Sequence, residues 1–294
     1  LARQVKRMEN PVLIAEAGCN HMGQIDIAKE MIDSASVFCN ISHIKFQKRN
    51  ICESLSPEQY RSKHPVPENS FGETYGLHRE HLEFTIDQHR ELQEYGKRQG
   101  IKCSTSVWDI TSLREVIELN PIWIKIPSSA NTNLKLLEVV CNEYQGEIHI
   151  SLGMTTRMEE EKILENLQKY NRLKDVVLYA CTSGYPVQFD EICLLEIPRL
   201  VDQYGYELMA VGFSGHHLGI AVDIAAFTLG ARYIERHFTL NRTWKGTDHA
   251  ASLEPGGMRK LRRDLDHTVT AMSLKKSEIL KVEEAQRKKL KQLG

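Results

Sequence analysis

Several features that would place a sequence in a special class of proteins are missing here. The seven cysteines are odd in number and never form a Cys-x-x-Cys pair, so neither a disulfide framework nor a zinc-thiolate site is indicated. No apolar run approaches the roughly 20 residues that span a bilayer, and the first residues lack the apolar core of a signal peptide. The 38 basic and 39 acidic residues leave a net charge of -1, which does not favour nucleic acid or a membrane as a partner. We therefore expect a cytoplasmic protein.

Eight short apolar runs recur along the chain, with amphipathic segments between them. The runs cover residues 11–18, 43–48, 101–106, 122–129, 147–153, 176–183, 210–216 and 233–238. Helical patterns fall between them, for example at residues 26–38, 86–100, 157–170 and 223–231. Parallel strands need helical crossovers, and eight such units close on themselves. The sequence therefore predicts an α/β fold, a (β/α)8 TIM barrel.

The predicted barrel forms a single domain over residues 1–271, and residues 272–294 are typical of a charged helical tail. A doubly wound open sheet is the alternative fold, but no Gly-x-Gly-x-x-Gly turn follows the first run. The interval between the second and third runs is unusually long and is rich in Pro, Ser, Asn and Gly. Such an interval indicates a lid or a binding loop.

Polar side chains gather where the runs end, which in a barrel of this kind is the face that carries the active site. The set comprises Glu16, Lys45, Gln47, Thr105, Lys125, Ser128, Ser151, Ser183, Tyr185, Ser214, His216, Glu235 and His237. Lysines inside apolar strands are costly to bury without a partner. Two of them beside several hydroxyl groups suit a compact anion such as a phosphate-carboxylate.

Each of these residues alone has an ordinary structural explanation. A serine at a strand end commonly caps a turn, a buried lysine commonly pairs with an acid, and a histidine is commonly a hydrogen-bonded core residue. Their convergence on one face favours a functional site. His216 and His237 end neighbouring strands, which suits a divalent metal with open coordination positions acting as a Lewis acid. His216 is in phase with Ser214, whereas strand alternation turns His217 the other way.

The segments at these strand ends also form a recognisable combination. They read IAEAGCNHMG, IKFQK, KIPSS, ISLGM, CTSGYP, GFSGH, IERHFT and GTDHAASLEP. In combination they resemble the sialic acid synthase (N-acylneuraminate synthase) family, from about residue 11 to the helix after residue 255. The resemblance implies a (β/α)8 transferase that condenses phosphoenolpyruvate with an N-acylated hexosamine aldehyde similar to N-acetylmannosamine. The implied products are a nonulosonic, sialic-type acid and phosphate.

The resemblance also implies a role for each matching residue. The positions that hold phosphoenolpyruvate are Lys45, Thr105, Lys125, Ser128, Ser151, Ser183 and Ser214. His216 and His237 match the metal ligands, for Mn2+ or alternatively Mg2+ or Co2+, and Glu16 matches a general acid/base that also orients the sugar. The sugar-binding positions are Gln47, Asn69, Tyr185 and Asp248. The implied catalytic set is Glu16, Lys45, Lys125, His216 and His237.

Many members of that family carry a C-terminal antifreeze-like domain, which this sequence lacks where it ends at Gly294. We therefore expect a homodimer in which the long loop or a neighbour's tail covers the acyl end of the sugar, with Arg79, Arg242 or a lysine of the tail as candidates. Two alternative functions stay open. One is a related phosphoenolpyruvate-dependent aldol-type synthase for another sugar or sugar phosphate. No additional arginine cluster for a second phosphate is evident at the strand ends, although loops could supply one. The other is a non-catalytic sugar-binding barrel, which the charged set at the strand ends disfavours.

Overall fold

A closed barrel of eight parallel strands forms the centre of the molecule, in a computed structural model that describes residues 10–292. The strands follow one another around the barrel in chain order. They are β1 (Val12–Gly18), β2 (His43–Lys48), β3 (Lys102–Val107), β4 (Trp123–Ile126), β5 (Glu147–Ser151), β6 (Val176–Cys181), β7 (Ala210–Gly215) and β8 (Tyr233–His237). The predicted (β/α)8 fold and its eight strands are confirmed.

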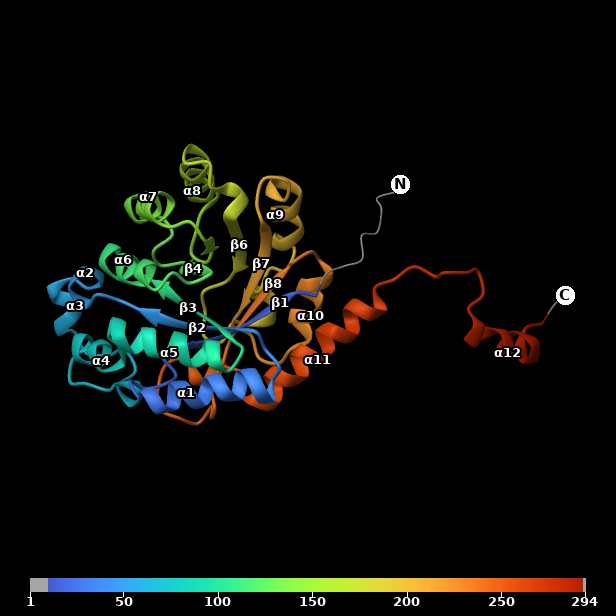
Figure 1. Cartoon of the computed structure of the whole chain (residues 1–294), viewed down its shortest axis with the longest axis horizontal. Helices are drawn as coiled ribbons and strands as arrows, with labels where there is room; N and C mark the ends of the chain where they lie inside the picture. The colour runs from blue at the N-terminus through green and yellow to red at the C-terminus, as the bar shows by residue number, and fades with distance from the viewer. Residues whose placement is uncertain (1–9, 293–294) are drawn as a thin grey trace.

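Helices surround the barrel on its outside (Figure 1). The main ones are α1 (Ile25–Asp33), α5 (Ile86–Arg98), α6 (Ile110–Glu118), α7 (Leu134–Glu143), α8 (Arg157–Lys169), α9 (Glu196–Tyr204), α10 (Ala221–Thr228) and α11 (Pro255–Ala271). A π-helical turn, Ser34–Phe38, extends α1. Reciprocal capping boxes start α5 at Thr85 and α8 at Thr156, where the side chains satisfy backbone N–H groups that lack intrahelical acceptors.

Alternation along each strand separates two kinds of interior. Side chains that point outward, such as Ile44 and Phe46 of β2, belong to the hydrophobic core between the barrel and its helices. Side chains that point inward, such as Lys45 and Gln47, line the cavity at the carboxyl end of the barrel. One strand therefore supplies both the core and the site, because its successive side chains face opposite sides.

The long interval between β2 and β3 is a small helical layer, not an irregular loop. It contains α2 (Ile51–Ser54), α3 (Pro57–Arg61), the 3-10 turn Pro67–Asn69 and α4 (Tyr75–Leu82). A capping box at Ser56 starts α3, and Thr74 caps α4. Because α4 packs against α2 and α3, this layer forms a fixed wall beside the barrel mouth.

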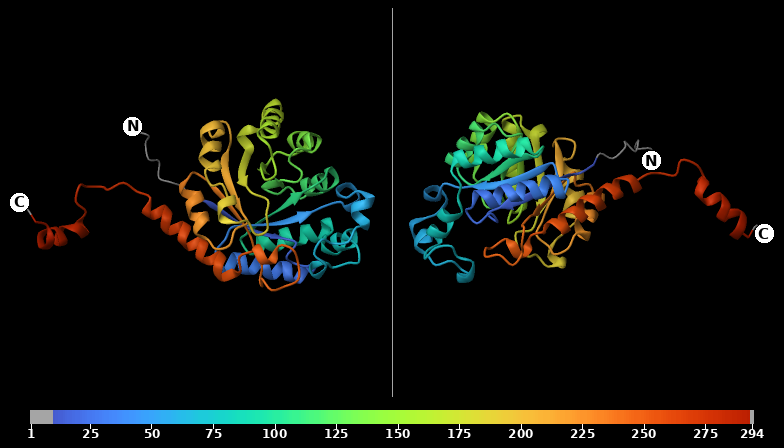
Figure 2. Two further views of the ribbon diagram at one scale, coloured as in Figure 1. Left: turned by 180° about the vertical axis from the view of Figure 1, so that it is seen from behind. Right: turned by 60° about the horizontal axis from the view of Figure 1, so that its bottom comes forward.

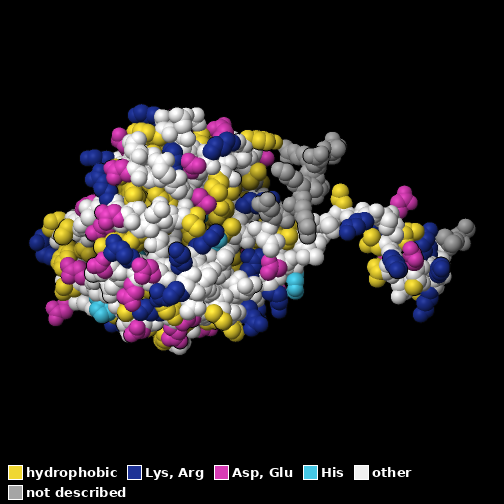
Figure 3. All heavy atoms as spheres, viewed as in Figure 1, with side chains coloured by type: hydrophobic (Ala, Val, Ile, Leu, Met, Phe, Trp, Pro, Cys, Tyr) yellow, Lys and Arg dark blue, Asp and Glu magenta, His cyan; other side chains and the backbone are white. Residues whose placement is uncertain are grey.

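The tail after α11 stands away from the barrel and carries α12 (Lys281–Leu290) (Figures 1 and 2). Residues 272–280 are not helical, so the predicted helical tail is a helix only in its second half. Figure 3 shows acidic, basic and apolar side chains interspersed over the visible face of the barrel. None of the helices between residues 10 and 292 has the length and apolar character required to cross a membrane.

Candidate functional site

A cavity of about 370 Å³ opens at the carboxyl ends of the strands. All but two of the residues predicted for the site line it. They are Glu16, Lys45, Gln47, Lys125, Ser128, Ser151, Ser183, Tyr185, Ser214, His216, His237 and Asp248. The convergence inferred from the strand ends is therefore present in the folded chain, since residues from distant parts of the sequence meet in one cavity.

Two lysines and two glutamates form the floor of this cavity. Lys45 Nζ is ion-paired with Glu16 Oε2 and donates a hydrogen bond to Ser106 Oγ at 2.6 Å. Lys125 Nζ lies 3.3 Å from Glu235 Oε2, and Lys45 Nζ lies 3.9 Å from the same oxygen. Both lysines are only 2% exposed, so their positive charges must be stabilised by these carboxylates or by an anion bound in the cavity.

The two floor carboxyls have different proton affinities. Burial raises the pKa of Glu16, and the charge of Lys45 opposes that rise only in part. Burial also acts to raise the pKa of Glu235, but Lys125 and Lys45 outweigh it and lower this pKa to about 2. Glu235 is therefore ionised at neutral pH, whereas Glu16 is the carboxyl suited to carry a proton.

Lys125 titrates closer to neutral pH than an ordinary lysine. Burial, together with the nearby charge of Lys45, lowers its pKa to about 8, although Glu235 opposes this. Its ammonium group lies 3.2 Å from the centre of the Tyr179 ring, which closes the cavity from below. The cation therefore rests on an aromatic face where it lines the cavity.

Serine hydroxyls cover the side of the cavity near Lys125. Ser128, Ser151, Ser183 and Ser214 lie at the ends of four strands, and Ser214 Oγ donates a hydrogen bond to Glu235 Oε1 at 3.1 Å. A side chain at Gly153 would lie 2.2 Å from Ser183 Oγ and 2.7 Å from Ser128 Oγ. Glycine at this position therefore lets the two hydroxyls approach each other at the rim.

The two predicted metal ligands lie next to each other, with ring centroids 5.3 Å apart. His216 Nδ1 lies 2.8 Å from the carbonyl oxygen of Thr182. Because a carbonyl only accepts, Nδ1 is the donor and Nε2 keeps its lone pair. Burial, reinforced by the charge of His237, lowers the pKa of His216 to about 4, so the ring is neutral at pH 7, as a metal ligand must be.

His237 offers a second nitrogen without a protein partner. Its Nδ1 is buried, accepts or donates no hydrogen bond within residues 10–292, and lies 3.9 Å from Asp248 Oδ2. In the same part of the chain, no three His, Cys, Asp or Glu side chains form a ready cation site. The donor set fits a divalent metal that takes two imidazoles from the protein and its other ligands from substrate and water.

A buried ion pair behind the histidines fixes their loop. Arg236 points outward from β8, pairs with Asp223 of α10 and donates hydrogen bonds to the backbone oxygens of His217 and Gly219. Asp223 and Arg236 are at most 1% exposed. The loop after β7 is therefore tied to β8, which holds His216 beside His237.

The open side of the cavity carries groups suited to a polyhydroxylated ligand. Gln47 Nε2 donates a hydrogen bond to Glu16 Oε1 at 3.0 Å, and the Tyr185 ring lies over His216 with a centroid distance of 4.4 Å. Although burial opposes it, the charges of His237, Arg79 and Arg49 lower the pKa of Asp248. Asp248 is therefore an acceptor for hydroxyl or amide groups at the rim.

Two predicted site residues lie elsewhere. Thr105 pairs with Phe46 in the barrel register and faces outward, into a small void beside α5 and α6. Its neighbour Ser106 faces the cavity instead, so the prediction was one residue out of phase. Asn69 ends the 3-10 turn of the helical layer and does not line the cavity.

Several cavity residues had no predicted role. Glu235 follows from strand alternation, since it is in phase with His237, whereas Ser106 is placed by its register with Lys125 of β4. Arg49 and Trp108 come from segments after strand ends, and Arg79, expected as a candidate to cover the acyl end of the sugar, comes from α4. Only the tertiary fold brings them to the cavity.

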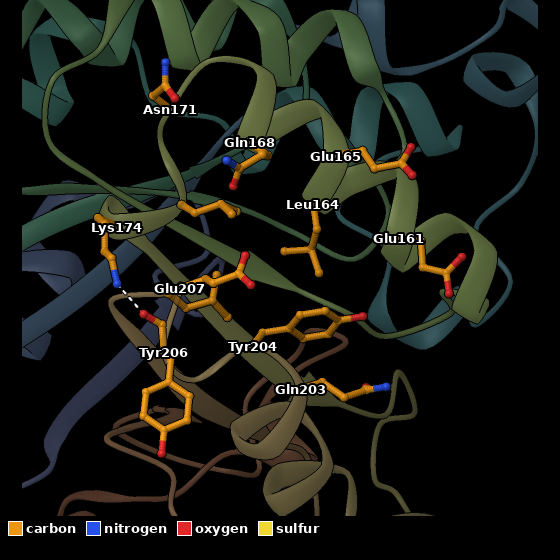
Figure 4. A pocket seen from close by; sticks show the side chains of 12 residues that line it. Glu161, Leu164, Glu165, Gln168, Asn171, Lys174, Gln203, Tyr204, Tyr206 and Glu207 are labelled. Carbon is orange, nitrogen blue, oxygen red and sulfur yellow. Dashed lines mark hydrogen bonds between the residues drawn. The ribbon is translucent and has the colours of Figure 1, made fainter.

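A larger groove of about 880 Å³ lies between α8 and α9, on the outer surface (Figure 4). Its walls include Leu164, Glu161 and Glu165 on α8 and Tyr204 on α9. It shares no residue with the strand-end cavity and lies toward the amino ends of β6 and β7.

Comparison with known proteins finds a matching family and similar chains. The sequence profile described as the NeuB family matches residues 31–277. Human N-acetylneuraminate-9-phosphate synthase is 36% identical over 284 residues, which cover 95% of this chain and 76% of that protein. N,N'-diacetyllegionaminic acid synthase of Campylobacter jejuni is 32% identical over 266 residues, which cover 90% of this chain and 78% of that protein.

The fold has a counterpart among solved structures. N-acetylneuraminic acid (sialic acid) synthetase from Leptospira borgpetersenii serovar Hardjo-bovis, crystallised in complex with citrate, superposes with a TM-score of 0.79. Its sequence is 27% identical, and the match covers 96% of this chain and 93% of that one. The similarity therefore extends over nearly the whole of both chains.

Proposed function

The chain belongs to the NeuB family of sialic and related nonulosonic acid synthases, and from that premise we propose that it is a phosphoenolpyruvate-dependent transferase. It joins phosphoenolpyruvate to an N-acylated hexosamine aldehyde and releases a nonulosonic acid and phosphate. The enol carbon C3 bonds to the aldehyde carbon, and the aldehyde oxygen becomes a hydroxyl group. Water adds at C2 and phosphate leaves, which gives the 2-keto acid.

One observation supports this proposal more strongly than any other. Lys45 and Lys125 converge from β2 and β4 on the floor of one cavity, and neither is explained by packing alone. Each retains donors for a charged oxygen, and the serine wall adds neutral donors beside Lys125. Such a surface suits the phosphate and carboxylate of phosphoenolpyruvate, because charge-assisted hydrogen bonds to oxyanions are short and strong.

The two buried carboxyl groups, Glu235 and Glu16, have different roles in proton transfer. Glu235 stays ionised and fixes both lysines, so it serves the cavity as a positioning charge. Glu16 is hydrogen-bonded to Gln47 and holds a proton more readily than an exposed glutamate does. We assign Glu16 the transfer of a proton to the oxygen of the acceptor aldehyde as the new carbon–carbon bond forms.

The aldehyde lies beside the two histidines in this scheme. His216 Nε2 and His237 Nδ1 would hold a divalent metal, for which Mn2+ is our first choice and Mg2+ or Co2+ the alternatives. When bound, such an ion supplies Lewis-acid polarisation of the aldehyde oxygen. Tyr185 and Asp248 line the same side and orient the sugar hydroxyl and amide groups. The predicted homodimer and cytoplasmic location stay predictions.

The test is release of inorganic phosphate from phosphoenolpyruvate by metal-replete enzyme with a panel of N-acylated hexosamines. The expected result is acceptor-dependent phosphate release with a nonulosonic acid identified by mass spectrometry. Phosphate release without an acceptor would point to a hydrolase. Binding of sugars without phosphate release from any acceptor would favour the non-catalytic barrel.

A further inference from the structure

Four side chains from the even-numbered strands meet in the interior of the barrel, and we call them the even-strand layer. Lys45 of β2 and Lys125 of β4 face Glu235 of β8, with Nζ–Oε2 distances of 3.9 and 3.3 Å. Tyr179 of β6 completes the layer, because its ring centre lies 3.2 Å from Lys125 Nζ. Alternate strands of a (β/α)8 barrel contribute the side chains of one interior layer, and these four residues follow that rule.

The even-strand layer carries more positive than negative charge. Its two ammonium groups face a single carboxylate, Glu235, whose pKa is lowered to about 2. Lys45 is also ion-paired with Glu16, whereas the second close contact of Lys125 is the ring of Tyr179. Tyr179 therefore occupies the place in the layer where a second carboxylate would cancel the remaining positive charge.

The ring of Tyr179 is held by its neighbours. It is fully buried, and it pairs in the barrel register with Gly212 of β7. A Cβ atom at Gly212 would lie 2.6 Å from Tyr179 Cε1, so glycine at this position makes room for the ring. The hydroxyl group lies 2.9 Å from His149 Nδ1. The ring therefore has a fixed position, with the Lys125 ammonium group over its face and its hydroxyl group engaged by His149.

An aromatic ring suits this position for an electrostatic reason. A buried ammonium group is unfavourable without nearby negative potential, and the face of an aromatic ring supplies that potential without a net charge. An aliphatic side chain would leave Lys125 with its share of one carboxylate. A carboxylate would stabilise the cation but would also repel an anionic substrate. The ring stabilises the cation and preserves the positive charge of the layer.

We propose that Tyr179 is a positioning residue of the substrate site, whose ring face keeps the Lys125 ammonium group charged and in place at the cavity floor without adding a carboxylate. The inference rests on the proposed function, which supplies phosphoenolpyruvate as the anion that this charge attracts. The hydrogen bond to His149 stabilises the fold, whereas the ring acts on the site through Lys125.

Several titratable groups surround the Lys125 ammonium group. They are Lys45 on β2, His149 on β5, Tyr179 and Cys181 on β6, and Glu235 on β8. The pKa of His149 is about 4, and burial raises the pKa of Tyr179 and of Cys181, so these three are neutral between pH 6 and pH 9. Lys125, whose pKa is lowered to about 8 by burial, changes its charge within that range.

The first test observes Lys125 without any ligand. Nuclear magnetic resonance of protein labelled with carbon-13 at the lysine Cε atoms gives the pKa of Lys125, and Lys125→Met assigns its resonance apart from Lys45. Tyr179→Leu should lower this pKa by about one pH unit, because the cation loses the aromatic face. Tyr179→Phe keeps the face and should keep the pKa. Tyr233→Leu is the matched control, since the Tyr233 ring contacts His149 instead.

A second series keeps the shape of the ring, so it applies even if Tyr179→Leu does not fold. Phenylalanine with one, two or three ring fluorines at position 179 weakens the negative face stepwise without opening a cavity. The pKa of Lys125 should fall with each added fluorine. A pKa that stays constant across this series would overturn the proposal, because the ring would then only fill space. A fall of equal size in Tyr233→Leu and Tyr179→Leu would overturn it as well.

Calorimetry with phosphoenolpyruvate alone connects the ring to the substrate. At pH 8.5, Tyr179→Leu should bind it about eightfold more weakly than the wild type does, and at pH 6.5, where Lys125 is mostly protonated in both proteins, the difference should be less than about twofold. A deficit of equal size at both pH values would mean that Tyr179 has only a structural role, which contradicts the proposal.

The two measurements also separate this inference from the proposed function. If the wild type does not bind phosphoenolpyruvate but the pKa of Lys125 falls in Tyr179→Leu, the proposed function is wrong and the action of the ring on Lys125 stands. If the wild type binds phosphoenolpyruvate but the pKa of Lys125 is the same in Tyr179→Leu, the proposed function stands and the role of Tyr179 is wrong.

Discussion

The two ends of the barrel both contain buried polar groups, yet they are built differently. At the amino end, His149 Nδ1 is hydrogen-bonded to Tyr179 Oη at 2.9 Å, and its Nε2 lies 3.2 Å from Glu147 Oε2. The Tyr233 ring packs edge-on against His149 with a centroid distance of 5.0 Å. At the carboxyl end, lysines, arginines and glutamates crowd one cavity. The amino end is an aromatic cluster, and the carboxyl end is a cluster of charges.

The buried side chains of His149 and Tyr179 are neutral at the amino end of the barrel, whereas buried Glu235 remains charged at the carboxyl end. Burial lowers the pKa of His149 to about 4 and raises the pKa of Tyr179, so both side chains are neutral at pH 7 and satisfy each other. At the carboxyl end, mutual pairing keeps Glu235 ionised in spite of burial. The His149–Tyr179 pair is satisfied without a ligand, whereas the carboxyl end holds charges that the proposed anionic substrate would complete. The predictions below test this difference.

The largest effect is expected at the two histidines of the carboxyl end. His216→Ala and His237→Ala should each lose bound manganese and lower kcat by about 10³-fold, since a Lewis acid contributes several kcal/mol to the barrier. Metal analysis and steady-state kinetics measure the two effects, and circular dichroism checks that the variants fold. His267→Ala, an exposed histidine of α11, is the control. If either cavity variant kept the metal content and rate of the wild type, that histidine would not be a metal ligand.

The floor lysines should give the next largest effect. Lys125→Met and Lys45→Met should each raise the KM for phosphoenolpyruvate by about 10- to 150-fold, because a charge-assisted contact contributes about 1.5–3 kcal/mol. Lys48→Met is the matched control. Lys48 belongs to the same strand as Lys45 but faces outward, where its Nζ pairs with Glu115 at 2.9 Å. If Lys48→Met raises the KM for phosphoenolpyruvate as much as Lys45→Met does, the loss of a charge at the cavity floor does not explain the weaker binding.

A smaller effect is expected from pH. The pKa of Lys125 is about 8, lowered by burial from that of an ordinary lysine, so the free enzyme loses this charge as the pH rises above 8. Between pH 7 and pH 9, kcat/KM for phosphoenolpyruvate should fall about tenfold, since this parameter reports ionisation in the free enzyme. Lys125→Arg keeps its charge over that range and should remove the decline. A wild-type profile that stays flat to pH 9 would contradict the assigned pKa.

The sequence predicted the barrel and most of its cavity because both depend on short-range alternation. Where a strand is a clear apolar run, knowing that one side chain faces the cavity predicts that the side chain two positions away faces it too. Gln47 follows from Lys45 in this way. The same rule misplaced Thr105 by one position, since Ser104, Thr105 and Ser106 are similar polar residues and hydrophobicity gives no phase there. Ser106 is identified by its register with Lys125 on β4.

Strand alternation could not predict which residues form the rim of the cavity. Arg79 lies on the short helix α4 and Glu83 follows it, and nothing in the sequence tells which side of this helix faces the barrel. Arg49 is fixed by stacking on Trp108, a contact between segments 59 residues apart in the chain. Asn69 shows the opposite failure, because a residue that the family resemblance implied for the sugar lies in a turn outside the cavity. Contacts of this kind exist only after folding.

The smallest functional effect is expected at the amino end, and it sharpens the comparison. His149→Phe removes the partner of Tyr179 Oη but fills the same space, so the free energy of unfolding should fall by about 1–3 kcal/mol. Denaturant unfolding measures this loss. Because no reacting group lies at this end, kcat/KM for phosphoenolpyruvate should change less than twofold. Restoring an acceptor for the Tyr179 hydroxyl with His149→Gln should recover part of the stability without altering kinetics. A large loss of kcat/KM in a fully folded His149→Phe protein would mean that the aromatic cluster acts on Lys125 through Tyr179, and the two ends would then function as one site.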